Sequence, residues 1–289
     1  MAAAAFFFSI MSLLVRVAGE RLPPSMLVLA RAGVALVLAF LMVRRAGLNP
    51  WGNARTLLVV RGLLGFAALS CYYYSLTHLP LAEATVIQYT NPVFTGLLAA
   101  LLLEERLRSV EFISVVVSLV GVVLVARPTF LFGAGAAHLD PVATGFALAG
   151  AVFSAFAYVA VRKSSGKDHP LVVVLWFPLI ATPLSVPLAV KQWVWPTPLE
   201  WVLLVGIGVA TQAAQVFMTE GLHREPAGRA TAMSYLQVAF AVAWGVAVLR
   251  EVPEWHTLAG ALLIGASVVG LALWKRPEDA AAAPTHPAA

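Results

Sequence analysis

The sequence predicts an all-α membrane protein whose ten transmembrane helices form a five-plus-five inverted-topology repeat. The first observation is compositional: 61% of the 289 residues are hydrophobic and 11% are charged. Soluble domains are closer to half apolar and a quarter charged, so composition argues against a soluble enzyme. The second observation is the regular recurrence of long apolar runs, and the third is a set of residues that repeats between the two halves.

Each apolar run is bounded by charged residues or by Pro and Gly, and each is expected to form one helix. A helix needs about 20 apolar residues to cross the hydrocarbon layer. The expected helices are residues 2–18, 25–43, 56–77, 82–103, 109–127, 141–162, 170–190, 198–220, 228–249 and 255–274. The segment that follows, 277–289, is rich in Ala and Pro and is predicted to be a disordered C-terminal tail.

The basic residues of the loops indicate the orientation of the chain. One set of alternate loops, with the segment after the last helix, holds twelve of the nineteen: Arg44, Arg45, Arg55, Arg106, Arg108, Arg162, Lys163, Lys167, Arg224, Arg229, Lys275 and Arg276. The opposite loops hold only Arg21, Arg127, Lys191 and Arg250. Basic loops stay on the cytoplasmic side, so we expect a multi-pass protein of the inner (plasma) membrane with both termini cytoplasmic. The net charge of +5 then requires no nucleic-acid partner.

The two halves of the chain match at an offset of 146 residues. Leu76, Pro80, Ala84, Thr85, Tyr89, Phe94 and Glu105 match Leu222, Pro226, Ala230, Thr231, Tyr235, Phe240 and Glu251. Five helices per half is an odd number, so the second copy is expected to lie upside down relative to the first. Inverted repeats are typical of secondary transporters, whose substrate site lies near the membrane midplane between the repeats.

The repeated segments resemble the EamA module of the drug/metabolite transporter superfamily. The first copy reads Leu79-Pro80-Leu81-Ala82-Glu83-Ala84-Thr85, Asn91-Pro92-Val93-Phe94 and Leu103-Glu104-Glu105; the second reads Pro226-Ala227, Ser234-Tyr235-Leu236-Gln237, Arg250-Glu251-Val252-Pro253 and Gly260. The resemblance implies a first EamA repeat over 1–128 and a second over 141–276, around a central cavity. It also implies alternating access and transport of a small organic solute, often outward. One departure is Val238, which stands where the first copy has Pro92.

Polar side chains inside the spans are the candidate cavity residues, because they are costly in lipid unless they face protein or water. Thr85, Gln88, Asn91 and Thr95 are expected on one face of helix 82–103, and Thr211 lies in the eighth helix. The predicted substrate-binding residues are Gln88, Tyr89, Asn91, Gln212, Gln215, Ser234, Tyr235, Gln237, Tyr158 and Arg31. The alternative is that these groups bond helix to helix as packing contacts.

Local backbone chemistry adds two expectations. Pro92 has no backbone N–H, so it is expected to free the carbonyl four residues earlier, that of Gln88. Serine in a span can bond its own backbone, and this structural role is favoured for Ser9, Ser12 and Ser154.

Charged residues near the span ends have separate interpretations. Arg31 and Arg61 lie about six residues inside their spans, roughly 9 Å deep. A guanidinium can reach the interface from that depth, so anchoring is favoured, with a cavity role as the alternative. Glu83 and Glu220 are the acids that could load a coupling proton.

No pattern for catalysis is found: the sequence has no zinc-protease, nucleophile-elbow or phosphate-loop motif, and its histidines lack metal-ligand spacing. We therefore expect no enzyme, cofactor or metal. The sequence favours a secondary transporter of an amino-acid-like, vitamin-like, heterocyclic or drug-like solute, with export slightly preferred. Its partners would be that solute, membrane lipid, and a coupling proton or counter-solute. A lipid scramblase or a non-transporting membrane scaffold is the alternative.

Overall fold

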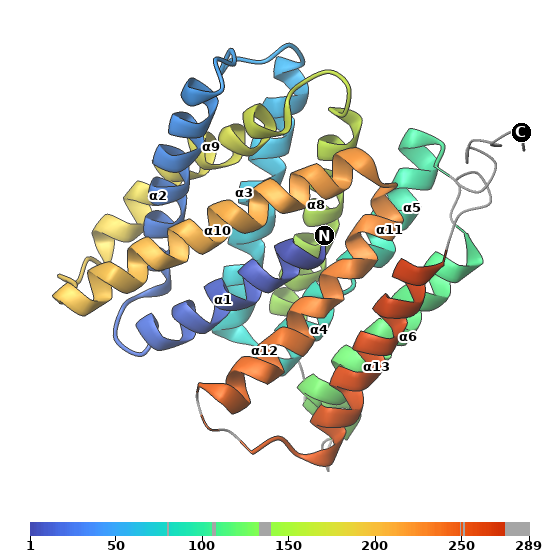
Figure 1. Cartoon of the computed structure of the whole chain (residues 1–289). Coiled ribbons are helices and arrows are strands. Elements are labelled where there is room, and N and C mark those ends of the chain that lie inside the picture. The colour runs from blue at the N-terminus through green and yellow to red at the C-terminus, as the bar shows by residue number, and fades with distance from the viewer. Residues whose placement is uncertain (80, 106–107, 133–139, 249, 251, 275–289) are drawn as a thin grey trace, which may run out of the picture.

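A computed structural model describes residues 1–79, 81–105, 108–132, 140–248, 250 and 252–274, which form helices and connecting turns without a strand (Figure 1). The helices of the first part are α1 (Ala2–Ala18), α2 (Pro24–Arg45), α3 (Arg55–His78), α4 (Leu81–Gln88), α5 (Asn91–Leu103), α6 (Ser109–Ala126) and α7 (Thr129–Phe132). Those of the second part are α8 (Pro141–Lys163), α9 (Pro170–Lys191), α10 (Pro198–Arg224), α11 (Ala227–Ala232), the 3-10 turn η1 (Met233–Tyr235), α12 (Leu236–Ala247) and α13 (Trp255–Leu273). The predicted tail 277–289 and Glu251 lie outside the described residues.

Nine helical segments in the described part of the chain are long and apolar enough to cross a membrane, counting α4 with α5 and α11 with α12 as one span each. The helix α1 is also apolar but has 17 residues. Large apolar side chains point outward along the helices; Val37, Leu101 and Leu262 are each more than half exposed. An apolar exterior of this kind suits contact with lipid tails rather than with water.

Two of the expected helices are interrupted, contrary to the sequence prediction. The helix expected over 82–103 ends at Gln88 and begins again at Asn91. The helix expected over 228–249 is interrupted by the 3-10 turn η1, which lies between α11 and α12. Pro92 is the second residue of α5, where a missing backbone N–H leaves no bond unmade. The second interruption has no proline. Because of the first interruption, the residues from Thr85 to Thr95 do not lie on one continuous helical face.

The helices pack as a bundle in which α10 contacts α1, α2, α8 and α9, while α6 and α13 lie side by side (Figure 1). The pair α6–α13 approaches closely where Gly121 faces Gly260. Further along the same contact, the hydroxyls of Ser114 and Ser267 lie 3.0 Å apart. Small residues thus allow these two backbones to come together, as is common in membrane bundles.

We expect Gly260→Ala to destabilise the protein, because a Cβ at this position would lie 2.6 Å from the carbonyl oxygen of Gly121. Overpacking of this kind costs about 1–3 kcal/mol. Thermal unfolding of the purified protein in detergent should show a lower Tm. The matched control is Gly265→Ala on the same helix, where an added Cβ meets nothing within 4 Å. Equal Tm values for the two variants would contradict the close packing of α6 on α13.

Candidate functional site

The two helix interruptions meet at a pair of tyrosines. The hydroxyl of Tyr235, which is fully buried, donates a hydrogen bond of 2.8 Å to the backbone carbonyl of Tyr89. The two rings stack, with centroids 5.8 Å apart and an interplanar angle of 26°. Backbone bonding resumes at the carbonyl of Thr90, which accepts from the N–H of Val93. The carbonyl that this bond between the two interruptions satisfies is that of Tyr89, and the expectation that Pro92 frees the carbonyl of Gln88 stays a prediction.

More tyrosines from neighbouring helices surround this junction. Tyr89 lies within electrostatic range of Tyr72 from α3 and of Tyr158 from α8. Tyr72 also lies near Thr85 of α4. The interior between α3, α4, α8 and η1 is consequently lined by phenol groups, which can donate and accept hydrogen bonds.

Arg61 of α3 is the most deeply buried cation of this region, with 3% of its surface exposed. Its Nη2 donates a 3.0 Å hydrogen bond to Oε1 of Gln215, and its guanidinium lies over the ring of Phe177, 5.0 Å from the centroid. Gly65 makes room for it, because a Cβ there would lie 2.6 Å from Nη1. The expectation that Arg61 anchors at the interface is wrong, because contacts with α9 and α10 turn it into the bundle.

Arg31 of α2 approaches the same region. Its Nε is buried without a hydrogen-bond partner, and the side chain lies within electrostatic range of Tyr73, Tyr158 and Arg61. In the part of the chain that the structure describes, neither Arg31 nor Arg61 forms an ion pair with a carboxylate. Two positive charges therefore share an interior region in which phenol and amide groups supply the polar contacts.

Most of the remaining predicted site residues make hydrogen bonds or close contacts within the bundle. Gln88 donates to Ser154 at 3.2 Å, Gln237 donates to Ser12 at 3.3 Å, and Ser234 bonds the carbonyl of Thr231. Gln212 approaches the sulfur of Met42 at 3.7 Å. These are the helix-to-helix and own-backbone contacts of the packing alternative. The buried amide oxygens of Gln88, Asn91 and Gln212 nevertheless have no hydrogen-bond partner.

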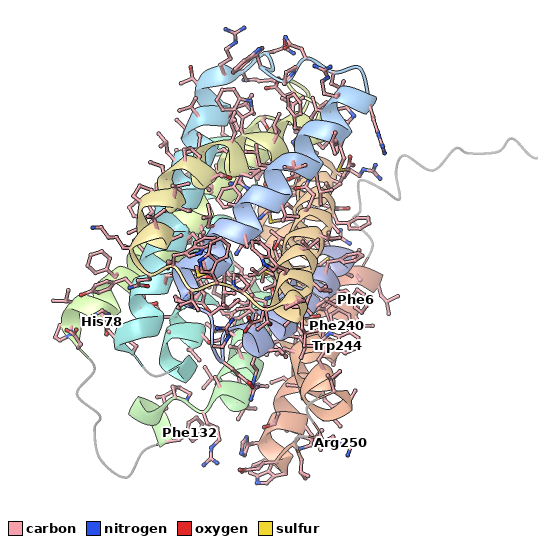
Figure 2. The ribbon with its side chains drawn as sticks, turned by 90° about the vertical axis from the view of Figure 1, so that its left-hand side faces the viewer. Phe6, His78, Phe132, Phe240, Trp244 and Arg250 are labelled. Atoms are coloured by element: carbon pink, nitrogen blue, oxygen red, sulfur yellow. The ribbon has the colours of Figure 1, made fainter. Side chains whose placement is uncertain are left out.

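The interface between α1 and α12 explains the serines of the first helix. Figure 2 shows Phe6 beside Phe240 and Trp244, with the Phe6 and Phe240 rings 5.5 Å apart. Ser9 bonds the carbonyl of Phe6, as expected for a serine in a span, and also accepts a hydrogen bond from Trp244 Nε1. Gln237 and Ser12 belong to this packed interface, so Gln237 does not join Tyr89, Tyr158, Arg31 and Gln215 in the interior group.

Of the two acids considered as coupling sites, only Glu220 has a side chain that the structure describes. Glu220 pairs with Arg224 on the same helix at 3.0 Å, and the side chain of Glu83 is outside what the structure describes. Within the described residues, no three His, Cys, Asp or Glu side chains come together as a metal site. The site offers guanidinium, amide and phenol groups, which can hold a polar organic molecule.

From the sequence, a cavity role was only the alternative for Arg61, and Tyr72 and Tyr73 were not among the predicted substrate-binding residues. The signal for Arg61 was available, because no acid stands three or four residues away from it on its own helix to pair with it. The signal for the tyrosines was weaker, since three in succession are also typical of an interfacial aromatic belt.

Comparisons with known proteins agree with this architecture. The EamA-like transporter family matches residues 1–127 and 142–273. The pseudopaline exporter CntI of Pseudomonas aeruginosa is 33% identical over 94% of both chains. Human solute carrier family 35 member G1 is 33% identical over 83% of this chain and 68% of its own length, and the S-adenosylmethionine uptake transporter of Rickettsia conorii is 26% identical over 71% and 68%. A crystal structure at 23% identity, covering 94% of both chains, has the same fold with a TM-score of 0.83.

The junction between the two interruptions should be sensitive to one hydroxyl. Tyr235→Phe keeps the ring and its stacking but leaves the buried carbonyl of Tyr89 without its donor. A buried acceptor left unpaired costs about 1–3 kcal/mol, so we expect a lower Tm in detergent. Removing a hydroxyl that packs but bonds only its own backbone, as in Ser185→Ala, is the control and should change the Tm less. A Tm for Tyr235→Phe equal to that of the unchanged protein would contradict the bond.

Proposed function

Because the chain belongs to the EamA-like transporter family, we propose that it is a secondary transporter that moves a small organic metabolite across the inner membrane by alternating access. Membership and the relatives already establish a multi-pass membrane transporter. The observation that carries the proposal is the meeting of two interrupted helices at Tyr89 and Tyr235, beside a buried polar group. Transporters commonly form their substrate sites from such discontinuous helices.

An inverted repeat over residues 1–128 and 141–276 is part of the proposal, and several contacts support it. Tyr89 and Tyr235 are separated by 146 residues, the offset that relates the two halves. The same offset relates Ser114 to Gly260 and Gly121 to Ser267. The contact between Gly121 and Gly260 and that between Ser267 and Ser114 are therefore equivalent, as a pseudo-two-fold axis requires. This arrangement lets the two halves rock about the central site.

Contacts between the halves at one end of the bundle can act as a gate. Glu105, just after α5, pairs with Arg162 of α8 at 2.6 Å and accepts a 2.8 Å hydrogen bond from the N–H of Ala227. Arg162 also donates to the carbonyl of His223 at 2.9 Å. This network joins the ends of four helices. Met1 contacts the position of Gly221 nearby, so in the proposed orientation this is the cytoplasmic end.

A second set of contacts joins the halves at the opposite end. Arg21, between α1 and α2, pairs with Glu200 in the first turn of α10 and donates to the carbonyl of Trp195. In the proposed cycle, the Glu105 network and the Arg21 pair break in alternation. Export is the preferred direction, because a relative matched over 94% of both chains is named an exporter. A coupling proton or counter-solute completes the cycle.

The function can be tested with purified protein in liposomes that are loaded with a bacterial metabolite extract. We expect selected small solutes to be released, as followed by mass spectrometry, at a rate above that of protein-free liposomes. A fluorescent phospholipid placed in the same membranes serves as a second readout. Movement of the lipid without release of solutes would contradict transport and favour the scramblase alternative.

The gate makes a separate prediction about accessibility. Glu105→Gln removes the charge that holds Arg162, so the cytoplasmic end should open more often. In a Cys71→Ser background, Thr231→Cys places a thiol one turn beyond Ala227, at a buried position of α11. A membrane-impermeant maleimide applied to inside-out vesicles should label this thiol several-fold faster with Glu105→Gln. The control, Arg224→Gln, removes an exposed pair within α10 and should not change the labelling rate. Equal rates in all proteins would contradict the gate.

A further inference from the structure

We propose that Arg31 and Arg61 bind a carboxylate of the transported molecule, so that the substrate class is an organic acid or a zwitterion that carries a carboxylate. This inference rests on the proposed transport function and assigns the chemistry of its site. The proposal stands on the joint position of the two arginines between α2, α3, α8 and α10. Arg31 was already predicted to bind substrate, and the proposal adds Arg61 as a second substrate-binding residue.

The first step of the argument is charge balance. An arginine keeps its proton in proteins, so burial does not remove its charge. Charged groups inside a membrane bundle face the interior or a cavity, and they pair with an opposite charge or mark a ligand pathway. Within the described residues, Arg61 is in electrostatic contact with a tyrosine, with Arg31 and with no carboxylate. A bound anion would supply the missing opposite charge.

The second step is the presentation of the guanidinium of Arg61. Gln215 accepts from Nη2, Phe177 lies beneath the group, and Nη1 packs against Gly65, where a Cβ would lie only 2.6 Å from it. Of the five N–H donors, the hydrogen bond to Gln215 uses one, and Nε has no partner among the described residues. A planar guanidinium that is held in place with free donors suits bidentate binding of a carboxylate.

The third step is the surroundings of the pair. Arg31 offers a buried Nε without a partner, and Tyr73 and Tyr158 lie within electrostatic range of it. Phenol hydroxyls can donate to the oxygen lone pairs that the guanidinium groups leave free. Two like charges also repel a cationic group, so an amine of a zwitterionic substrate must point away from them.

Thermal unfolding of the detergent-purified full chain can test the inference with matched solutes. The probes are succinate, glutarate and glutamate, compared at equal ionic strength with the neutral diamides succinamide and glutaramide, with putrescine and with inorganic phosphate. We expect at least one carboxylate to raise the Tm more than its amide counterpart does, because the amide cannot bind both arginines through charge. Stabilisation by phosphate alone would overturn the carboxylate assignment.

Variants then connect the effect to the two arginines. Arg61→Gln and Arg31→Gln should each weaken the apparent affinity for that carboxylate by at least about tenfold, the effect of losing one charged hydrogen bond. Arg61→Lys keeps the positive charge but loses the bidentate geometry, so it should fold and still bind the carboxylate more weakly. It provides a second test if Arg61→Gln does not fold. The control is Arg55→Gln, at the exposed start of the same helix α3, which should bind like the unchanged protein.

The liposome assay separates failure of this inference from failure of the transport proposal. Release of carboxylates that falls in the Arg31 and Arg61 variants would support both. Release of neutral or cationic solutes at rates that these variants do not change would overturn the anion assignment and leave transport intact. A protein that neither binds carboxylates nor releases any solute would contradict both proposals.

Discussion

The structure depends on one constraint: hydrocarbon cannot replace a hydrogen bond that the protein fails to make. Regular helix satisfies the backbone, and many of the polar side chains in the spans bond to their own or an adjacent helix. Ser9 and Ser185 bond their own backbone, and Gln88 reaches Ser154 across two helices. The two interruptions lie inside the bundle, and there the hydroxyl of Tyr235 bonds the buried carbonyl of Tyr89. The first interruption therefore receives a hydrogen bond from the second.

The hydrogen bond between Tyr235 and Tyr89 has a mechanical consequence. This bond joins the two halves of the chain at the points where a span of each half is interrupted. Tyr89 is also the residue through which the junction lies within electrostatic range of Tyr158, and Tyr158 in turn is near both Arg31 and Arg61. Ligand bound at the arginines would therefore lie close to the segments that must bend if the halves rock. This proximity identifies the interrupted segments around Tyr89 and Tyr235 as the part of the fold through which ligand binding and rocking of the halves can be coupled.

The sequence predicts the spans well because lipid imposes a length and a polarity that can be counted along the chain. The interruptions are harder to predict. Pro92 is a sequence signal for the first interruption. The second interruption has Val238 at the equivalent position, and its Tyr235 contacts Tyr89, which is distant in the sequence. The depth of Arg61 could also be counted, but the face on which it lies could not. That face is set by Phe177 and Gln215, from helices more than a hundred residues away. The contact of Gln237 with Ser12 of α1 likewise joins residues more than two hundred positions apart, which no local pattern predicts.

The relative cost of polar groups explains why glutamines and arginines of this bundle have different roles. A buried amide needs hydrogen bonds worth about 0.5–1.5 kcal/mol each, and a serine on the next helix can supply them. A buried guanidinium carries an effective desolvation penalty of several kcal/mol, which neutral groups offset only in part. Gln88 and Gln237 are thus largely accommodated by Ser154 and Ser12, whereas Gln215 cannot neutralise Arg61. The unbalanced charge, rather than the amides that first drew attention in the sequence, is the feature of this interior that best defines what it can bind.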